Sequence, residues 1–246
     1  MEKIFRSILL KIIGLHGYLA FVSDIYIRLI KIGFFKKKYP EMFYLKNIIN
    51  NGDVCLDIGA NVGYYSVFLS KLTGKSGRVF SIEPVPLFAN IFLINCKKFA
   101  LDNITLYQTA LGSENKKIEM GTPFIDGVFR HGLTKVIDDT NKHNLKTFEA
   151  EMRIPDELFA DFEKLNFIKC DVEGYEVHLF PHLLQTIKKF KPAIQIEISS
   201  VENRKQIFEL LQPLGYKIFT LSHSKLNELK AEDALHYNHG DFYLKA

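Results

Sequence analysis

The chain has 246 residues, of which 47% are hydrophobic and 24% charged, and its 21 phenylalanines and 11 tyrosines can fill a large core. This composition is typical of a soluble globular protein, and the length fits one domain better than two. The net charge of +4 is uneven, because residues 1–50 hold nine Lys/Arg and only three Asp/Glu, whereas the remainder holds 23 and 25. The charge does not support a nucleic-acid footprint along the whole chain, and a local basic face for a membrane surface or an acidic partner stays open.

The N-terminal segment, residues 1–48, is expected to be a helical extension that precedes a domain covering residues 49–246. Its longest charge-free run, residues 12–23, is too short to span a bilayer. Apolar residues recur there at helical spacing, with basic residues between them. Three hypotheses stay open: a helix packed on the domain, a basic interfacial helix in residues 1–38 that contacts an anionic membrane, or a cleaved signal.

From residue 53 onward, short apolar runs alternate with helical patterns. Strands are expected at residues 54–58, 78–82, 104–111, 166–172, 193–198, 216–221 and 241–246, and helices at 64–72, 86–100, 177–190 and 202–211. This alternation implies crossover connections and a mostly parallel α/β sheet. The polar interval 112–162 is expected to form a hairpin plus an irregular loop that selects the substrate.

The three cysteines, Cys55, Cys96 and Cys170, are widely spaced, and no CxxC pair occurs. Two of them lie in apolar runs that are typical of buried strands. We therefore expect reduced thiols and a cytoplasmic location, with the inner face of a membrane as the alternative to a fully soluble protein.

A glycine turn, Asp57-Ile58-Gly59-Ala60-Asn61-Val62-Gly63, follows the first expected strand. Gly59 and Gly63 can supply the tight turn and a close backbone approach to a ligand. A dinucleotide site would carry a third glycine between them, and that glycine is missing. Asp57 instead suits a cation such as the methionine ammonium of S-adenosylmethionine, while the backbone N–H groups of the turn suit its carboxylate.

Glu83 ends the next expected strand, and Pro84 stops that strand. Because neighbouring parallel strands end at one edge of the sheet, the Glu83 carboxylate is expected beside the glycine turn. There it can accept hydrogen bonds from both hydroxyls of a ribose. The expected cofactor is S-adenosylmethionine. The residues expected to bind it are Asp57, Gly59, Ala60, Asn61, Gly63, Glu83 and Pro84, together with Asp171 near the end of the strand expected at residues 166–172.

Four segments together resemble the FkbM family of S-adenosylmethionine-dependent methyltransferases: DIGANVGYYS (57–66), IEP (82–84), FIKCDVEGYE (167–176) and KPAIQIEI (191–198). The resemblance covers roughly residues 50–245 and is most specific around DVEG. It implies a Rossmann-like sheet of seven strands whose last strand is antiparallel. It also implies O-methylation, often of sugar hydroxyls in polysaccharide or natural-product biosynthesis. Cys170 departs from the aliphatic residue usual in the family, at a position inside a strand.

Methyl transfer from a sulfonium requires a positioned acceptor, and an alcohol acceptor also benefits from a base. Asp171 is expected near the donor methyl, in contact with the cofactor or the acceptor, and Glu173 lies two residues on. His131, in the polar interval, is a further candidate base. Glu197 is expected to border the acceptor pocket, but two carboxylates do not predict a metal site. The predicted catalytic residues are Asp171, Glu173 and His131.

The expected function is therefore O-methylation of a sugar, polysaccharide or other small-molecule hydroxyl. A nicotinamide dehydrogenase is disfavoured by the missing middle glycine. A nucleic-acid methyltransferase stays open but lacks the Asn/Asp-Pro-Pro-Tyr/Phe and Pro-Cys motifs, and no nucleic-acid partner is expected. A cofactor-binding scaffold without turnover also stays open, and the oligomeric state is not predicted.

Overall fold

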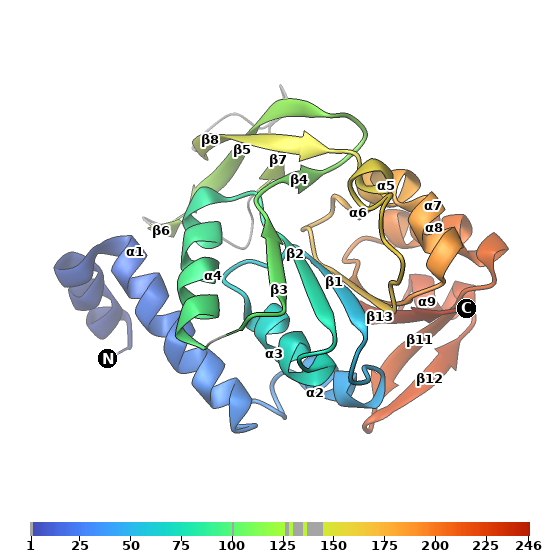
Figure 1. Ribbon diagram of the computed structural model, residues 1–246, viewed down its shortest axis with the longest axis horizontal. Coiled ribbons are helices and arrows are strands. Elements are labelled where there is room, and N and C mark those ends of the chain that lie inside the picture. The colour runs from blue at the N-terminus through green and yellow to red at the C-terminus, as the bar shows by residue number, and fades with distance from the viewer. Residues whose placement is uncertain (1, 100, 126–127, 130–134, 137–144) are drawn as a thin grey trace.

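The computed structural model describes residues 2–99, 101–125, 128–129, 135–136 and 145–246 (Figure 1). Its main sheet has eight strands in the order β12-β11-β13-β10-β9-β1-β2-β3. The bounds are β1 (Val54–Ile58), β2 (Arg78–Ile82), β3 (Ile104–Tyr107), β9 (Phe167–Cys170), β10 (Ala193–Glu197), β11 (Lys217–Ser222), β12 (Lys225–Leu229) and β13 (Asp241–Lys245).

The strand directions confirm the predicted α/β sheet. β3, β2, β1, β9 and β10 are parallel, and β13 inserts antiparallel between β10 and β11. β12 is an additional edge strand that the sequence pattern did not predict. It follows β11 through a two-residue turn, in which His223 and Ser224 have φ angles of 51° and 60°. Such left-handed pairs are the geometry of tight hairpins, although neither residue is a usual signal for one.

The helices between the strands are α3 (Tyr64–Thr73), α4 (Pro86–Lys98), α6 (Glu176–Leu179), α7 (Leu184–Phe190) and α8 (Val201–Leu211). Shorter segments are α5 (Pro155–Leu158), α9 (Ala231–Leu235) and 3-10 turns at Leu45–Asn47, Phe180–His182 and Gln212–Leu214. The single helix predicted at residues 177–190 is wrong. Pro181 lies in the 3-10 turn between α6 and α7, where a proline cannot supply the N–H that a continuous helix requires.

The sheet separates two hydrophobic layers, because alternate residues of a strand point to opposite faces. Leu56 of β1 packs in a cluster with Ile187 of α7 and Ile207 of α8. Its neighbour Cys55 packs on the other face with Leu69 of α3. All three cysteines are free thiols, and Cys96 is the one that is only half-buried.

A second, five-stranded sheet is formed by residues 110–111 and the polar interval and lies across the top of the main sheet in Figure 1. Its strands are β4 (Ala110–Leu111), β5 (Lys116–Ile125), β6 (Val128–Phe129), β7 (Lys135–Val136) and β8 (Leu145–Arg153). The predicted hairpin is present as the antiparallel pair β5 and β8. The single strand predicted at residues 104–111 is wrong, because Thr109 donates to the Glu151 carbonyl and β4 pairs with β8 instead of β2.

The N-terminal segment forms α1 (Glu2–Lys31) and α2 (Pro40–Tyr44). α1 is much longer than the expected pattern and bends at Gly14, whose φ of 67° and ψ of 175° are not helical. Its second half packs on α3 and α4, where Ser23, Ile27 and Ile30 are buried. Within the described residues one segment, Leu9–Lys31, is long and apolar enough to cross a membrane, judged by length and composition alone.

Candidate functional site

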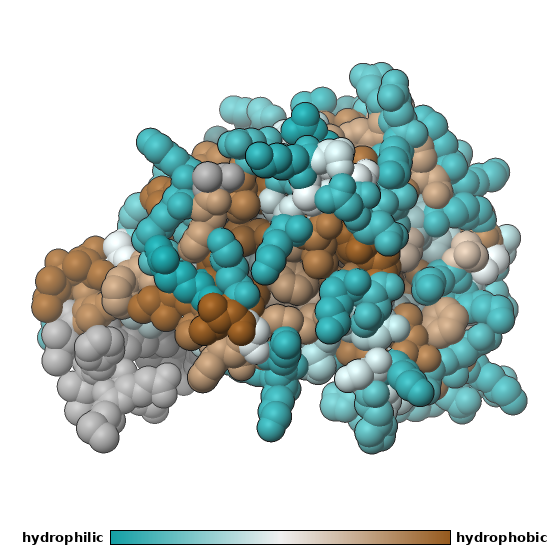
Figure 2. Space-filling view, turned by 60° about the horizontal axis from the view of Figure 1, so that its bottom comes forward, coloured by the Kyte–Doolittle hydropathy of each residue, from teal (hydrophilic) through white to brown (hydrophobic). Residues whose placement is uncertain are grey.

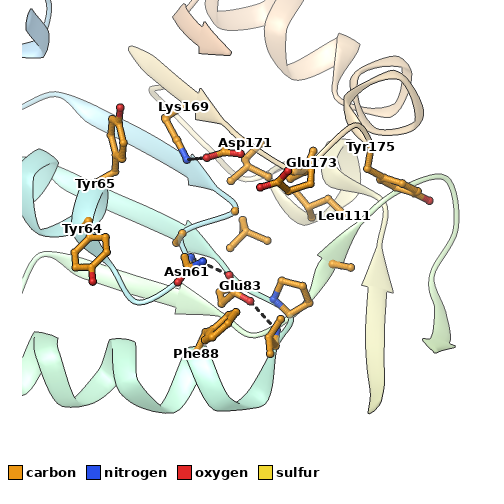
Figure 3. Close-up of a pocket in the computed structure, with 18 of the residues that line it drawn as sticks. Asn61, Tyr64, Tyr65, Glu83, Phe88, Leu111, Lys169, Asp171, Glu173 and Tyr175 are labelled. Carbon is orange, nitrogen blue, oxygen red and sulfur yellow. Dashed lines mark hydrogen bonds and ion pairs between the residues drawn. The ribbon is translucent and has the colours of Figure 1, made fainter. Parts of the chain in front are cut away.

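A cavity of about 690 Å³ opens at the carboxyl ends of β1, β2 and β9 (Figure 3). Its size is in the range of small-molecule and cofactor sites, and its position is where open α/β sheets bind ligands. The predicted site residues that line it are Gly59, Ala60, Asn61, Glu83, Pro84, Asp171 and Glu173. Asp57 and Gly63 do not line it, and His131 lies outside the described residues.

The glycine turn is held by packing against the end of β9. Gly59 has a φ of 81°, and a Cβ built there would lie 1.9 Å from the carbonyl oxygen of Asp171. The Asp171 N–H in turn donates to the Ile58 carbonyl at 3.0 Å. The close approach that requires glycine is thus made to the neighbouring strand, which places Asp171 directly beside the turn.

The backbone N–H groups of the turn are engaged within the protein. Those of Gly59 and Ala60 both donate to the Ile82 carbonyl, and that of Gly63 donates to the Ala60 carbonyl. The N–H of Asn61 donates to Glu83, and the Asn61 side chain accepts from Val62 N–H. A ligand carboxylate therefore needs a donor other than the N–H groups of residues 59–63.

Glu83 is held between two backbone donors at the floor of the cavity. Asn61 N–H donates to Oε2 and Val85 N–H donates to Oε1, both at 2.8 Å (Figure 3). A carboxylate has about four lone-pair positions, so two remain for further donors. Burial raises the pKa of Glu83 to about 7, against the two N–H bonds, which lower it. The geometry fits a carboxylate that accepts two more hydrogen bonds from a vicinal diol.

Asp57 is fully buried behind the turn. Its Oδ2 accepts a hydrogen bond from Ser66, whose hydroxyl also contacts that of Ser81, and its Oδ1 has no partner within the described residues. Burial raises the pKa of Asp57, although the nearby Lys169 lowers it. Asp57 therefore supports the turn from behind, and direct contact with a ligand ammonium stays a prediction.

Lys169, in β9, is a site residue that the sequence analysis did not identify. Its ammonium lies 3.1 Å from Asp171 Oδ2 and 4.8 Å from the centre of the Tyr65 ring. Although burial lowers the pKa of Lys169, the carboxylates of Asp171 and Asp57 raise it above its usual range, so the side chain stays charged. The signal was available in the sequence, because a lysine inside an apolar strand, two residues before Asp171, shares that residue's face.

The loop after β9 presents a second carboxylate to the cavity. Figure 3 shows Glu173 reaching into the space beside Asp171. Glu173 has a φ of 54°, a conformation that is uncommon for residues other than glycine. Glu176 holds the loop in place, because its Oε1 accepts from Gly174 N–H at 3.1 Å and from Val172 N–H at 3.4 Å.

The structure also places the other acidic and histidine side chains considered for the site. Glu197 does not line the cavity and instead lies opposite Asp241 in the pairing of β10 with β13. Among the described residues, a histidine that lines the cavity is His178 of α6, whose ring lies 4.9 Å from that of Tyr175. Across the part of the chain that is described, no three His, Cys, Asp or Glu side chains gather closely enough to hold a metal ion.

The N-terminal segment forms one wall of the cavity, which motif analysis had no means to predict. Tyr26 and Ile30 of α1 line it together with Tyr39 and Met42 from the turn and helix that follow. The Tyr26 ring lies 5.7 Å from that of Tyr64 at the start of α3. The cavity therefore has a carboxylate side at the strand ends and an aromatic side formed largely by the N-terminal segment.

Comparison with known proteins finds a methyltransferase family and individual methyltransferases that resemble this chain. The family described as "Methyltransferase FkbM domain" matches residues 57–220. The chain is 26% identical to the protein-L-isoaspartate O-methyltransferase of Ignicoccus hospitalis over 129 residues, which are 52% of this chain and 59% of that protein. It is 30% identical to protein-L-isoaspartate O-methyltransferase 2 of Archaeoglobus fulgidus over 76 residues, 31% of this chain and 33% of that one.

The chain thus covers less than two thirds of either of these relatives. Among solved structures, methyltransferase FkbM from Methylobacillus flagellatus KT aligns with a TM-score of 0.49 and 16% identity, over 78% of this chain and 43% of that chain.

Proposed function

Because this chain belongs to the FkbM family of methyltransferases, we propose that it transfers the methyl group of S-adenosylmethionine to a hydroxyl oxygen of a sugar, polysaccharide or other small molecule. One observation carries the proposal. Glu83, which follows β2 and has two lone-pair positions left for a ribose, lines the same cavity as Asp171 and Glu173, which follow β9 on the other side of β1.

The charged groups of the cavity fit the amino-acid end of the cofactor. Lys169 and Asp171 form an ion pair in which the Asp171 side chain is about one-third exposed and the lysine is buried. The methionine carboxylate would pair with Lys169, which serves as its donor because the N–H groups of the turn are already engaged. The methionine ammonium would pair with Asp171. Pro84, Ala110 and Leu111 supply apolar surface in the same cavity for the adenine ring.

The cofactor supplies an activated methyl group, so the remaining work of the protein is to orient the acceptor and remove its proton. Glu173 is our candidate base, because its side chain reaches the space beside Asp171 and its backbone is held in an uncommon conformation. A carboxylate is a suitable acceptor for the proton of an alcohol only in a site that excludes water. The aromatic wall of Tyr26, Tyr39 and Tyr64 provides that surrounding.

The acceptor is a hydroxyl rather than a carboxylate in this proposal. The two relatives above are named for transfer to isoaspartate, which carries a carboxylate, but they share only part of the chain. An anionic acceptor would lie beside Asp171 and Glu173 and be repelled by them. The enzyme is proposed to act in the cytoplasm, without a nucleic-acid partner, in peripheral contact with a membrane through residues 1–38.

The test is a methyl-transfer assay with isotopically labelled S-adenosylmethionine. Glycan and small alcohol acceptors form one arm, and an isoaspartyl peptide forms the other. We expect label only in the hydroxyl arm, and the isosteric substitution Glu173→Gln should reduce turnover by at least a hundredfold while cofactor affinity stays within twofold. Transfer to the isoaspartyl peptide alone would refute the hydroxyl assignment. A scaffold would be favoured by two results together. The protein would bind the cofactor but methylate no acceptor, and cells carrying Glu173→Gln would behave like wild-type cells.

A further inference from the structure

Helix α1 presents different faces to the cavity and to solvent. Tyr26 and Ile30 line the cavity, whereas Phe21 and Ile25, four residues apart on the outer face, are 47% and 39% exposed. Large apolar side chains on the surface of a soluble protein are unremarkable when scattered. Here most of the exposed ones among the described residues lie on α1 or in the turn after it, the segment that also supplies Tyr26 and Tyr39 to the aromatic wall of the cavity.

The turn that follows α1 continues this apolar surface. Ile32 and Phe34 are 77% and 69% exposed, and Lys36 and Lys37 follow them with exposed side chains. Figure 2 shows hydrophobic residues concentrated at the left of the molecule, where Figure 1 places α1, while most of the remaining surface is hydrophilic. We call Phe21, Ile25, Ile32, Phe34, Lys36 and Lys37 the docking surface.

A chain of aromatic contacts connects the docking surface to the cavity. The rings of Phe34 and Phe35 lie 5.2 Å apart, and Phe35 stacks on Tyr26 at 4.8 Å. Tyr26 then contacts Tyr64, which also lines the cavity, at 5.7 Å. Ring contacts therefore connect the exposed Phe34 to the wall of the site, and the Lys38 ammonium lies over the Phe35 and Tyr26 rings, 5.7 Å from each centre.

The packing of α1 shows how a membrane would meet this surface. Although α1 is long enough to span a bilayer, Ser23, Ile27 and Ile30 are buried against the protein. Asp24 lies on the same helix and pairs with Lys98 of α4 at 2.8 Å. A helix held laterally in this way lies along a membrane surface, with its outer apolar residues in the interface and lysines near the phosphates.

From this arrangement we propose that the docking surface binds an anionic lipid bilayer and that the methyl acceptor is a hydroxyl-bearing amphiphile anchored in the same bilayer. The inference rests on the proposed methyltransferase function and specifies its substrate class. The lipid portion of the acceptor stays at the interface beside Phe34, and its hydroxyl-bearing head group enters the cavity along the wall of Tyr26, Tyr39 and Tyr64.

The absence of tryptophan from the whole sequence permits a clean fluorescence test of the surface. Phe34→Trp places a single tryptophan on the docking surface. Val201→Trp, on α8 at the opposite side of the molecule, is the matched control because Val201 is also exposed, at 46% (Figure 1). Each variant is titrated with phosphatidylglycerol–phosphatidylcholine vesicles, with pure phosphatidylcholine vesicles, and with brominated lipid as quencher.

We expect a blue shift and bromine quenching for Phe34→Trp with anionic vesicles only, and no change for Val201→Trp. Binding should weaken in high salt, and Lys36→Gln with Lys37→Gln should reduce vesicle affinity at least tenfold. Unchanged Phe34→Trp emission with anionic vesicles, or equal responses from the two variants, would overturn the docking surface.

The acceptor class is tested separately with labelled S-adenosylmethionine and membranes of the cells that make the protein. We expect label in material extracted by organic solvent, and at least a tenfold loss of that label for Ile25→Ser with Phe34→Ser. Label confined to water-soluble products would overturn the amphiphile assignment. Calorimetry with S-adenosylhomocysteine distinguishes failure of the proposed function from failure of this inference. Protein that does not bind S-adenosylhomocysteine refutes the methyltransferase proposal. Protein that binds it normally but does not associate with vesicles refutes only the membrane inference.

Discussion

The pKa of Glu83 makes nucleoside binding dependent on pH. Its carboxyl has a pKa raised by burial to about 7 in the folded protein, so the fraction that can accept hydrogen bonds decreases as the pH is lowered through 7. Because a ribose requires the ionised form, affinity should decrease about tenfold between pH 8 and pH 6. The probe is 5′-methylthioadenosine, which has the ribose but neither charged group of methionine.

Glu83→Gln is the control for this pH dependence, because glutamine keeps an acceptor oxygen and does not titrate. Its affinity should be lower at pH 8 and constant from pH 8 to pH 6. A pH dependence that persists in the variant would assign the titration to another group. The same pKa implies that ionisation of Glu83 costs stability, so the unfolding free energy should decrease between pH 4.5 and 7 in the wild type more than in Glu83→Gln.

Lys169 is predicted to bind the carboxylate end of the cofactor. Lys169→Met should weaken S-adenosylhomocysteine binding by about tenfold to a hundredfold, the range for loss of a hydrogen bond to a charged group. Binding of 5′-methylthioadenosine should be unchanged, because that ligand has no carboxylate, and this result also shows that the variant is folded. Equal weakening for both ligands would show that Lys169 acts on the structure of the site and not on the carboxylate.

Gly59 tests the packing of the turn against β9. Gly59→Ala combines an unfavourable positive φ with a contact on a backbone oxygen that cannot move aside. Gly215→Ala is matched to it, because Gly215 has a similar φ of 86° but no atom within 4 Å of the added Cβ. In urea denaturation we expect Gly215→Ala to lose about 1 kcal/mol and Gly59→Ala to lose at least about 3 kcal/mol. Equal losses would show that conformation alone requires the glycine.

At the scale of elements, the N-terminal helix has two halves with different roles. Deletion of residues 1–13, which precede the bend at Gly14, should leave thermal stability and S-adenosylhomocysteine affinity nearly unchanged. Deletion of residues 1–38 also removes Ile27 and Ile30 from the core, at a cost of about 1.5–3 kcal/mol for each side chain. Differential scanning calorimetry of the two deletions measures this difference, and similar melting temperatures would contradict the packing of α1.

The elements that were predicted correctly are those with strong local signals. β1 and β2 are short, largely apolar runs that end at Gly59 and at Glu83-Pro84, and their bounds match the prediction. The errors occur where contacts between residues far apart in the sequence determine whether a strand forms and where it ends. Thr109 divides an apparently continuous strand because its hydroxyl bonds to the distant Glu151 carbonyl. β12 is mostly polar, so only its pairing with β11 makes it a strand.

The same division applies to the site. Gly59, Glu83 and Asp171, which line the cavity, were predicted because each stands at the end of an expected strand or in the turn after one, whereas Asp57 and Gly63, predicted on the same ground, do not line it. Lys169 was missed because a strand interior was interpreted only as core. Tyr26 and Tyr39 could not be assigned from motifs, since α1 reaches the cavity only through packing on α3 and α4. The prediction for His131 lies outside the described residues and is untested.

For the whole molecule, the family membership and the methyltransferase-type sheet predicted from the sequence are confirmed. The division into residues 1–48 and 49–246 stays a prediction. Ile30 and Met42 share a buried cluster with Cys55 and Leu69, so the stability of the N-terminal segment is coupled to that of the main sheet. The acceptor and the membrane contact are proposals. They concern the same cavity, which is lined by residues of both the N-terminal segment and the main domain.

The most direct test of this account is a calorimetric titration of the full-length protein with S-adenosylhomocysteine, with nicotinamide adenine dinucleotide as the comparison ligand. We predict micromolar affinity for the first ligand, at least tenfold weaker binding in Glu83→Ala, and no binding of the dinucleotide. Circular dichroism of each sample establishes that it is folded. Folded wild-type protein that does not bind S-adenosylhomocysteine, or that prefers the dinucleotide, would contradict the assignment of the cavity to the methyl donor.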